Sequence, residues 1–515
     1  MHHLLEYAYT SRLDLSLENI QDVLSAASHV QMIDVINACS SFLEEQMDLD
    51  NCVDVATIAE TYSLWQLRKK VNHFICANLL SFSHNSEFHR LSSNQLEFIL
   101  ECDYPVDCSE FEVLNIVLKW FQFNFNERRK YASLLRHIHF KEIPKDRLTI
   151  HWNLIEQITE KQIYLYRKIF LQKNYQTTEN QNKCLVNSRG MECAIVNVGG
   201  FNGICGITNE ITYYLENEKK WKYLSRVPHV EQCNFGCAVY NNELYVVGGC
   251  FNQSLEENVH PFGFRFNPLS NSLNGWSTIA PMQKERCRFT LTAVDNYLYA
   301  IGGAGENDFP LIEDEFASGE MYDPKNDIWI PINPMPGFNR SQHAAVAWNH
   351  YIFVSGGLDQ DIVLNSMLKY NTLTDEWTNI DPMITPRADH TLVVHDDKIY
   401  VCGGWYEDEM TEMRILVGTI ECYDLLTNSW SVVTNIPTPR YHAGIVNKGP
   451  ILYIIGGFLS DSTFDRASGI IESFNLMTHV WSTLDSYPQD IWEHSCCTLF
   501  VPKYRDDMEV INDKL

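Results

Sequence analysis

A pair of adjacent glycines recurs six times in the C-terminal three-fifths of the chain, and no other feature constrains the fold as strongly. The pairs are Gly199-Gly200, Gly248-Gly249, Gly302-Gly303, Gly356-Gly357, Gly403-Gly404 and Gly456-Gly457, with successive spacings of 49, 54, 54, 47 and 53 residues. Most pairs end a short run of β-forming residues, as in Leu244-Tyr245-Val246-Val247. A repeat of roughly 50 residues with this content is typical of a propeller made of four-stranded blades. We therefore predict an all-β propeller with six blades.

An aromatic residue and a tryptophan follow each glycine pair. In five repeats they lie seven residues apart: Tyr214/Trp221, Tyr322/Trp329, Tyr370/Trp377, Tyr423/Trp430 and Phe474/Trp481. In the remaining repeat, an insertion through 271–275 separates Phe266 from Trp276. We expect each pair to flank a tight hairpin and to fill the space between blades, burying about 150–250 Å² per aromatic side chain. The double glycine would let the strand end turn sharply.

The N-terminal third of the chain has helical rather than strand periodicity. Ile20, Val23, Leu24 and Ala27 follow the i, i+3, i+4, i+7 pattern of an amphipathic helix, and similar stripes recur up to about residue 170. Ser109 and Glu112 form an S-x-x-E capping box before another such helix. We expect these stripes to pack helix on helix, with a partner groove as the alternative. Residues 171–192 are polar and without a period, which indicates a connector.

Charge and hydropathy exclude several classes of partner. The formal net charge of the 515-residue chain is −27, which disfavours nucleic acid and anionic lipid surfaces. A basic protein partner is compatible with this charge, as is a merely solvated acidic surface. No apolar run reaches the roughly 18 residues of a membrane span, and residues 1–7 lack the pattern of a secretory signal. We expect a cytoplasmic protein without a membrane segment.

The 16 cysteines are scattered, and none forms the paired CxxC motifs of a zinc site. We interpret them as small core residues with free thiols in a reducing compartment, and a reactive sensor thiol is the alternative.

The glycine pairs and phased aromatics resemble the kelch family from about residue 193 to 505. The Trp-Asp ending of shorter WD40 repeats is absent. The resemblance implies that the C-terminal strand completes the N-terminal blade, and here 495–503 would be that strand.

The helical part resembles two further domains. Residues 9–13, 23–27 and 39–43 are similar to the last third of a BTB domain, and residues 51–67, 111–125 and 134–135 are similar to a BACK domain. BTB, BACK and kelch in this order are the arrangement of the Kelch-like family. We predict a C-terminal BTB segment over 1–46, a BACK domain over 47–150, a helical extension and linker over 151–192, the propeller over 193–505 and an acidic tail over 506–515.

The resemblance implies a substrate adaptor of a cullin-three RING ubiquitin ligase. BTB would dimerise and hold the cullin, BACK would contact the cullin with its first helices, and kelch would capture the substrate for ubiquitination. The first two-thirds of the BTB domain has no counterpart before Met1. The chain is therefore expected to be either an incomplete gene model or a natural short form that binds substrate without delivering it. An interaction protein that binds actin or another cytoskeletal protein, or that sequesters substrate, is the alternative function.

The resemblance also places the substrate over one mouth of the propeller. Aromatic side chains that follow the glycine pairs would be anchors there, or would pack the base of the loops. They are Phe201, Phe251, Trp405, Tyr406 and Phe458.

An arginine lies sixteen residues before the first glycine of four repeats, at Arg286, Arg340, Arg387 and Arg440. Equivalent positions converge on one circle in a ring, so these guanidinium groups, with Arg288 nearby, would bind carboxylates or phosphates. The alternative is that each one bonds backbone carbonyls of the propeller. Gln232 occupies the equivalent position in the preceding repeat.

Other candidate sites are weaker. His343 and His390 lie three residues after their arginines and are expected to pack at strand starts, with a metal pair as the alternative. The acidic insertion from Glu306 to Glu320 is expected to be a solvated loop, or to contact a basic partner segment. We find no nucleophile elbow, no phosphate-binding loop and no copper-oxidase ligand set. The sequence therefore predicts a non-catalytic protein without a metal or another cofactor.

Overall fold

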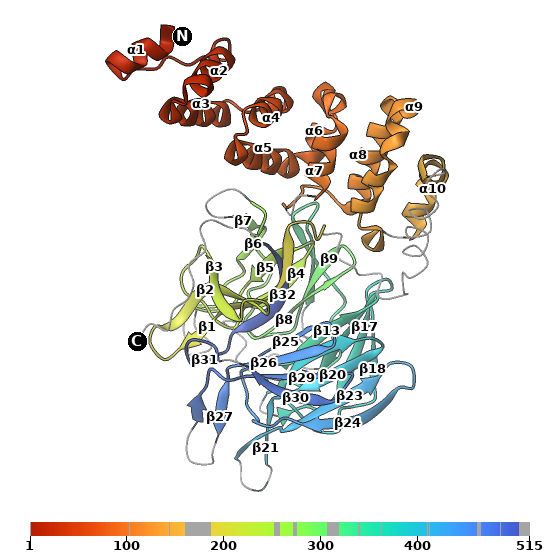
Figure 1. Ribbon diagram of the computed structural model, residues 1–515. Coiled ribbons are helices and arrows are strands. Elements are labelled where there is room, and N and C mark those ends of the chain that lie inside the picture. Colours follow the sequence, from red (N-terminus) through yellow and green to blue (C-terminus); the bar gives the residue numbers. More distant parts are fainter. Residues whose placement is uncertain are drawn as a thin grey trace. The chain divides into compact units, whose positions relative to one another are not determined.

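The chain forms two compact units, one helical and one built of strands (Figure 1). The computed structural model describes residues 2–101, 104–143, 145–159, 187–251, 258–270, 275–305, 319–337, 340–360, 362–408, 410, 413–460, 465–484 and 486–503. Most of the predicted linker, the insertion at 306–318 and the tail at 506–515 lie outside these residues. None of the helices in these ranges is long and apolar enough to cross a membrane.

The helical unit confirms the predicted all-α N-terminal region. Its helices are α1 (His2–Thr10), α2 (Ile20–Val30), α3 (Ile33–Glu45), α4 (Cys52–Thr61), α5 (Trp65–Ala77), α6 (Leu79–Phe82), α7 (Ser93–Glu101), α8 (Glu110–Phe123), α9 (Phe125–Arg128) and α10 (Lys145–Thr159). Short 3₁₀ segments cover Ser86–Arg90, Arg129–His137 and Phe140–Glu142. Ile20, Val23, Leu24 and Ala27 all face the core from α2, as the stripe requires.

Helix α8 begins at the predicted capping box. Ser109 Oγ accepts a hydrogen bond from the Glu112 amide, and the Glu112 carboxylate accepts one from the Ser109 amide at 2.8 Å. Both groups would otherwise be unsatisfied donors of the first helical turn.

A buried ion pair joins the segment before the first strand to helix α8. Arg189 donates to both carboxylate oxygens of Glu110, at 2.9 and 2.7 Å, and to the Leu100 carbonyl at 2.6 Å. Asn187 donates to the same carboxylate at 3.0 Å. The end of the connector is therefore fastened to the helical unit.

The strand-rich unit contains six blade sheets among the described residues, which confirms the predicted blades. Five of them have four antiparallel strands, and the sheet of blade 1 also includes the short β31 (Ile491–Trp492). From the inner to the outer strand, blade 1 is β32 (Ser495–Pro502), β1 (Met191–Asn202), β2 (Gly206–Leu215) and β3 (Lys220–Arg226). Blade 2 is β4 (Gly236–Tyr240), β5 (Glu243–Val247), β6 (Gly263–Phe266) and β7 (Trp276–Ile279), and blade 3 is β8 (Thr290–Val294), β9 (Tyr297–Ile301), β10 (Gly319–Asp323) and β11 (Ile328–Pro331). Blade 4 is β13 (Ala344–Trp348), β14 (Tyr351–Ser355), β17 (Met367–Asn371) and β18 (Glu376–Ile380). Blade 5 is β19 (Thr391–His395), β20 (Lys398–Cys402), β23 (Thr419–Asp424) and β24 (Ser429–Asn435), and blade 6 is β25 (Gly444–Lys448), β26 (Ile451–Ile455), β29 (Ile471–Asn475) and β30 (Val480–Leu484).

The C-terminal strand closes the ring. Strand β32 pairs with β1 at the other end of the propeller sequence, and Phe500 exchanges backbone hydrogen bonds with the Asn242 side chain of blade 2 at 2.8 and 2.9 Å. The inner strands contact one another in the order β4, β8, β13, β19, β25. The expected completion of the first blade by the C-terminus is confirmed.

The phased aromatics join neighbouring blades. In every repeat the aromatic and its tryptophan are cross-strand partners, with ring centroids 4.8–5.4 Å apart. Trp329 Nε1 also donates to the Ala280 carbonyl of the preceding blade at 2.8 Å, and Trp377 Nε1 donates to the Asn333 carbonyl at 2.9 Å. Five of the six tryptophans bond in this way to the preceding blade, whereas Trp221 Nε1 has no hydrogen-bond partner among the described residues.

Both glycines of each pair adopt a positive φ that disfavours other residues. In blade 4, φ is 56° at Gly356 and 89° at Gly357. A Cβ atom there would lie 2.3 Å from the Arg387 carbonyl oxygen and 2.5 Å from the Ser341 carbonyl oxygen, respectively. Only glycine allows these close backbone approaches.

Candidate functional site at the mouth of the propeller

The mouth is the end of the propeller where the glycine pairs follow the second strands and where the chain enters each inner strand. Short ribbons extend several of the loops at this end. They are β12 (Arg340–Ser341) with β15 (Leu358–Asp359) and β16 (Ile362–Val363), β21 (Trp405–Glu407) with β22 (Arg414–Leu416), and β27 (Phe458–Ser460) with β28 (Asp465–Ala467). Figure 1 shows β21 and β27 reaching beyond their blades.

One cross-strand pair per blade forms the base of the mouth, and we call these six the mouth pairs. From blade 1 to blade 6 they are Phe201/Trp492, Cys233/Cys250, Cys287/Ala304, Ser341/Leu358, Ala388/Trp405 and Tyr441/Phe458. Each joins the residue after a glycine pair to a residue just before an inner strand.

Three of the predicted aromatic anchors belong to these pairs. Phe201 is 1% exposed and stacks on Trp492, with ring centroids 5.9 Å apart. Trp405 is 4% exposed, and the half-buried Phe458 packs on Tyr441 and Trp492. The alternative interpretation therefore applies to Phe201 and Trp405, which pack the base of the loops and present almost no surface to a partner.

Phe251 and Tyr406, the other two predicted anchors, are half-buried. Phe251 stacks on His229 and His260, with centroids 5.3 and 4.6 Å away. Both residues follow a mouth pair directly and retain exposed surface, so their role as anchors stays a prediction.

The arginine series requires a correction, because its guanidinium groups are buried. Arg286, Arg340, Arg387 and Arg440 are between 0% and 6% exposed. In three blades the arginine Nη1 atom donates to the carbonyl oxygen of the first glycine of the pair. The distances are 3.0 Å to Gly302, 3.0 Å to Gly403 and 3.2 Å to Gly456. The expectation of guanidinium groups open to a ligand is wrong for these buried side chains, and the backbone-bonding alternative is observed.

Each of these three arginines also has a buried glutamate partner that was not predicted from the sequence. The ion pairs are Arg286–Glu320, Arg387–Glu421 and Arg440–Glu472, with N···O distances of 2.9, 2.7 and 2.5 Å. A sequence pattern could have indicated these partners, because each glutamate lies two residues before the phased aromatic of its blade. Buried charges require such compensation.

Arg340 lacks this partner because Leu368 occupies the glutamate position of blade 4. Its Nη2 atom donates to Ser366 Oγ at 2.9 Å, while Nη1 has no hydrogen-bond partner among the described residues. Burial lowers the pKa of Arg340 to about 10, and Asp359 partly opposes that shift. Arg340 is therefore the least compensated charge beneath the mouth.

A ring of six residues links the blades around the mouth, and we call it the linking ring. Each lies two residues after the arginine position and has a positive φ of 49–54°: Asn234, Arg288, Gln342, Asp389, His442 and Glu493. Amide-to-carbonyl bonds of 2.9–3.1 Å join Arg288 to Asn234, Gln342 to Arg288, Asp389 to Gln342 and Glu493 to His442. Of this ring, Arg288 alone was predicted from the sequence, although all six positions share the constant offset of two residues from the arginine position.

The linking ring divides into an acidic and a basic part. His442 Nε2 lies 3.8 Å from the Asp389 carboxylate and 3.6 Å from the Glu493 carboxylate. Burial raises the pKa of Glu493, and Asp389 adds to this effect, whereas His442 and Arg288 oppose it. The half-buried Arg288 makes no ion pair in the part of the chain that the structure describes. The mouth thus offers carboxylates on one side and a guanidinium group on the other.

The two aligned histidines pack at strand starts. His343 Nε2 lies 3.2 Å from Thr290 Oγ1, and His390 Nε2 lies 2.7 Å from Ser355 Oγ. Burial lowers the pKa of His343 to about 3 and that of His390 well below its ordinary value. Burial thus favours the neutral form of both rings, and each contacts a hydroxyl group of the preceding blade.

One group in the helical unit has the residue types of a metal site. Ligand atoms of Glu110, His139 and Glu142 lie within 4.8 Å of one another. The Glu110 carboxylate already accepts hydrogen bonds from Arg189, Asn187 and the His139 amide, so its charge is compensated without an ion.

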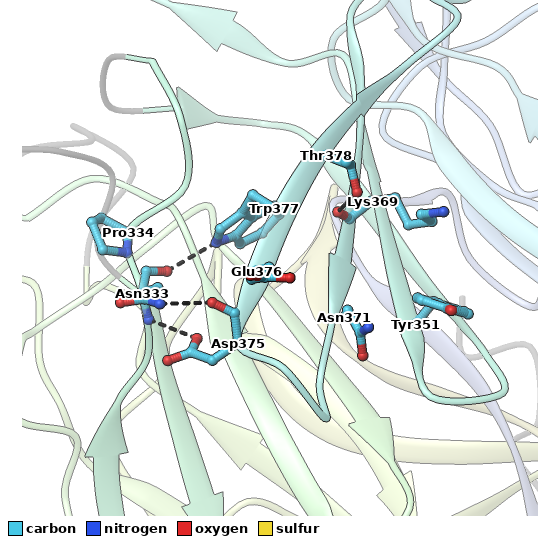
Figure 2. A pocket seen from close by; sticks show the side chains of 9 residues that line it. All are labelled: Asn333, Pro334, Tyr351, Lys369, Asn371, Asp375, Glu376, Trp377 and Thr378. Carbon is cyan, nitrogen blue, oxygen red and sulfur yellow. Dashed lines mark hydrogen bonds between the residues drawn. The ribbon is translucent and has the colours of Figure 1, made fainter.

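A polar groove of about 550 Å³ lies at the seam between blades 3 and 4 (Figure 2). Trp377 Nε1 donates to the Asn333 carbonyl there, and Asn333 donates to the Asp375 carboxylate and carbonyl, so these groups join the blades. Tyr351 and Lys369 line its other side. Because Tyr351 begins β14 and Gly356 follows its end, the groove is at the opposite end of the blade from the mouth.

Comparison with known proteins agrees with this architecture. Residues 1–47 match the BTB/POZ domain, and residues 52–153 match the family described as BTB And C-terminal Kelch. Residues 190–404 match the KLHDC2/KLHL20/DRC7 Kelch-repeats domain, and residues 320–501 match the Attractin/LZTR1 beta-propeller. BTB, BACK and kelch matches in this order support a Kelch-like architecture for the chain.

Kelch-like relatives match over almost the whole chain. Kelch-like protein 26 of Danio rerio is 25% identical over 97% of this chain and 82% of its own length. Kelch-like protein 36 of Mus musculus is 25% identical over 96% of this chain and 80% of its own length. The BTB, BACK and kelch matches of this chain thus lie in a sequence that aligns with Kelch-like proteins over almost its full length.

Proposed function

We propose that this chain is the substrate-recognition adaptor of a cullin-three RING ubiquitin ligase, and that the mouth of the propeller captures the protein to be ubiquitinated. The order of BTB, BACK and kelch regions, shared with Kelch-like relatives over almost the whole chain, carries the proposal. Adaptors of this architecture supply proximity rather than catalysis. The chain is accordingly proposed to be non-catalytic and, given its sequence, cytoplasmic.

The mouth supports the substrate half of the proposal. Its base is a layer of mouth pairs, and its half-buried side chains include two aromatics, Phe251 and Tyr406, and Arg288, which makes no ion pair with the described residues. Aromatic and arginine side chains on a rigid platform are frequent anchors of protein interfaces.

The cullin half is tested by co-purification. The full chain is mixed with cullin-three, and the product is examined by size-exclusion chromatography with light scattering. A stable complex is the expected result, and a chain that elutes free of cullin at micromolar concentration overturns this half of the proposal.

The substrate half is tested by capture from cell extract followed by mass spectrometry. A Phe251→Ala, Arg288→Ala, Tyr406→Ala variant is expected to lose specific partners at least tenfold. Leu373→Ala is the matched control, because Leu373 is 72% exposed in a turn at the opposite end of blade 4. Equal losses from both variants would place the capture surface elsewhere. The comparisons provide no support for binding to actin, so no cytoskeletal function is proposed.

A further inference from the structure

Three thiols meet beneath the mouth at blades 2 and 3. Cys233 and Cys250 form the mouth pair of blade 2, and their sulfur atoms are 3.6 Å apart. Cys287, in the mouth pair of blade 3, belongs to the same buried apolar cluster. All three residues are 0% exposed.

Packing alone does not demand two thiols at this place. The mouth pairs of blades 1, 5 and 6 contain aromatic rings, and those of blades 3 and 4 are Cys287/Ala304 and Ser341/Leu358. Among the six mouth pairs, blade 2 is the one in which both partners carry sulfur.

The backbone of this pair has the spacing of a disulfide. The Cys233 amide donates to the Cys250 carbonyl at 2.9 Å, and the Cys250 amide donates to the Cys233 carbonyl at 3.0 Å. Such a hydrogen-bonded cross-strand pair has a Cα separation of about 5.5 Å, which lies inside the range of roughly 4.4–6.8 Å found for disulfides. Side-chain rotation can therefore bring the sulfur atoms from 3.6 Å to the bonded distance of about 2.05 Å without moving the strands.

The surroundings favour a thiolate on one sulfur. The side-chain nitrogen of Asn234, Nδ2, lies 3.7 Å from Cys233 Sγ and 3.8 Å from Cys250 Sγ. Hydrogen bonds from the thiols of Cys233 and Cys287 lower the pKa of Cys250, burial opposes this shift, and Asn234 and Arg288 add to it. Thiolate character controls the reactivity of cysteine.

We propose that Cys233 and Cys250 are a thiol-oxidation site that forms a reversible disulfide with hydrogen peroxide, a molecule of nearly the size of water. The Cys250 thiolate attacks one peroxide oxygen, the S–O bond forms, the O–O bond breaks, and the released hydroxide takes a proton to become water. The Cys233 sulfur then attacks the Cys250 sulfenic acid, the S–S bond forms and a second water leaves. Two thiols are oxidised, and one peroxide is reduced to two waters.

The link would join the chain entering blade 2 to the loop after its glycine pair. Asn234 of the linking ring and the predicted anchor Phe251 are the neighbours of the two cysteines, so oxidation fixes both at the mouth. This consequence, unlike the disulfide itself, rests on the proposed function of the mouth.

The test is non-reducing peptide mapping of the full chain. The protein is treated with hydrogen peroxide, denatured, blocked with iodoacetamide and cleaved after glutamate. Cleavage after Glu243 separates Cys250 from Cys233 and Cys237, so the disulfide appears as a joined peptide that lacks two hydrogen atoms and separates on reduction. The exposed Cys205 reports that oxidant is present.

Matched serine variants identify the partner. The joined peptide is expected in the unsubstituted chain and in Cys237→Ser, and it is expected to disappear in Cys233→Ser and Cys250→Ser, with unchanged thermal unfolding of each reduced variant. Persistence in Cys233→Ser, or no joined peptide in a folded sample whose Cys205 is oxidised, overturns the proposal. Capture of the same partners by the oxidised and reduced chains, with the disulfide present, would overturn only the consequence for the mouth and would leave the proposed function intact.

Discussion

Replacement of Arg387 by leucine should destabilise the propeller rather than simply remove a ligand contact. Arg387 is 0% exposed and donates four hydrogen bonds: to the Gly403 carbonyl at 3.0 Å, to the Thr419 carbonyl at 2.9 Å, to Thr419 Oγ1 at 3.0 Å and to Glu421 at 2.7 Å. The variant leaves the equally buried Glu421 carboxylate with the Ile384 amide as its remaining hydrogen-bond donor among the described residues.

The expected cost is about 3–5 kcal/mol, since removal of one partner leaves an uncompensated buried charge. Exposed pairs contribute only about 0–1 kcal/mol, so burial decides the magnitude. The double variant Arg387→Leu, Glu421→Leu should recover much of this loss, because an apolar replacement of a buried ion pair is often neutral. Blade 4 already has Leu368 at the glutamate position.

Denaturant unfolding of the full chain, followed by tryptophan fluorescence, measures the effect. Arg288→Leu is the control, because Arg288 is half-buried and makes no ion pair among the described residues. A single variant within 1 kcal/mol of the parent chain that nevertheless loses its captured partners would refute the structural role of Arg387 and restore the original expectation of ligand contact.

Three further predictions follow from the same contacts. Trp329→Ala should cost about 3–5 kcal/mol in chemical denaturation, because Trp329 is 5% exposed and its Nε1 atom bonds to the preceding blade; a cost below 1 kcal/mol would contradict this packing. Burial lowers the pKa of His343 to about 3 in the folded chain, whereas in the unfolded chain the ring takes up a proton as the pH falls below about 6.5. The folded state therefore loses stability as the pH falls from about 6.5 towards 3. His343→Phe should reduce the difference in unfolding midpoint between pH 7.5 and pH 5, with Phe289 at the equivalent position of blade 3 showing that a phenyl ring fits. Deletion of residues 495–515 should abolish cooperative unfolding of the propeller, measured by calorimetry, because β1 loses its inner partner β32; a retained transition would show that the ring does not need the closing strand.

The site was less predictable than the blades because a repeat in sequence does not reveal which way a side chain points. Arginines at a constant offset indicated a circle of guanidinium groups. The four side chains are buried beneath the mouth, and three of them bond to glycine carbonyls. The residues two positions later form the linking ring, and each has a positive φ. The six positions hold six different amino acids, so no shared residue type indicates this backbone conformation.

The sequence by itself determined the two-part architecture, the number of blades, the phased aromatic pairs, the capping box of α8 and the closing strand. These features follow from local periodicity, from glycine's tolerance of positive φ and from the need of each blade to bury its faces. Tertiary structure alone decided which charges are buried, which aromatics reach the surface, and that Cys233 meets Cys250. Those outcomes depend on contacts between residues far apart in the chain, where burial sets the free energy of a charge and backbone register sets the distance between side chains.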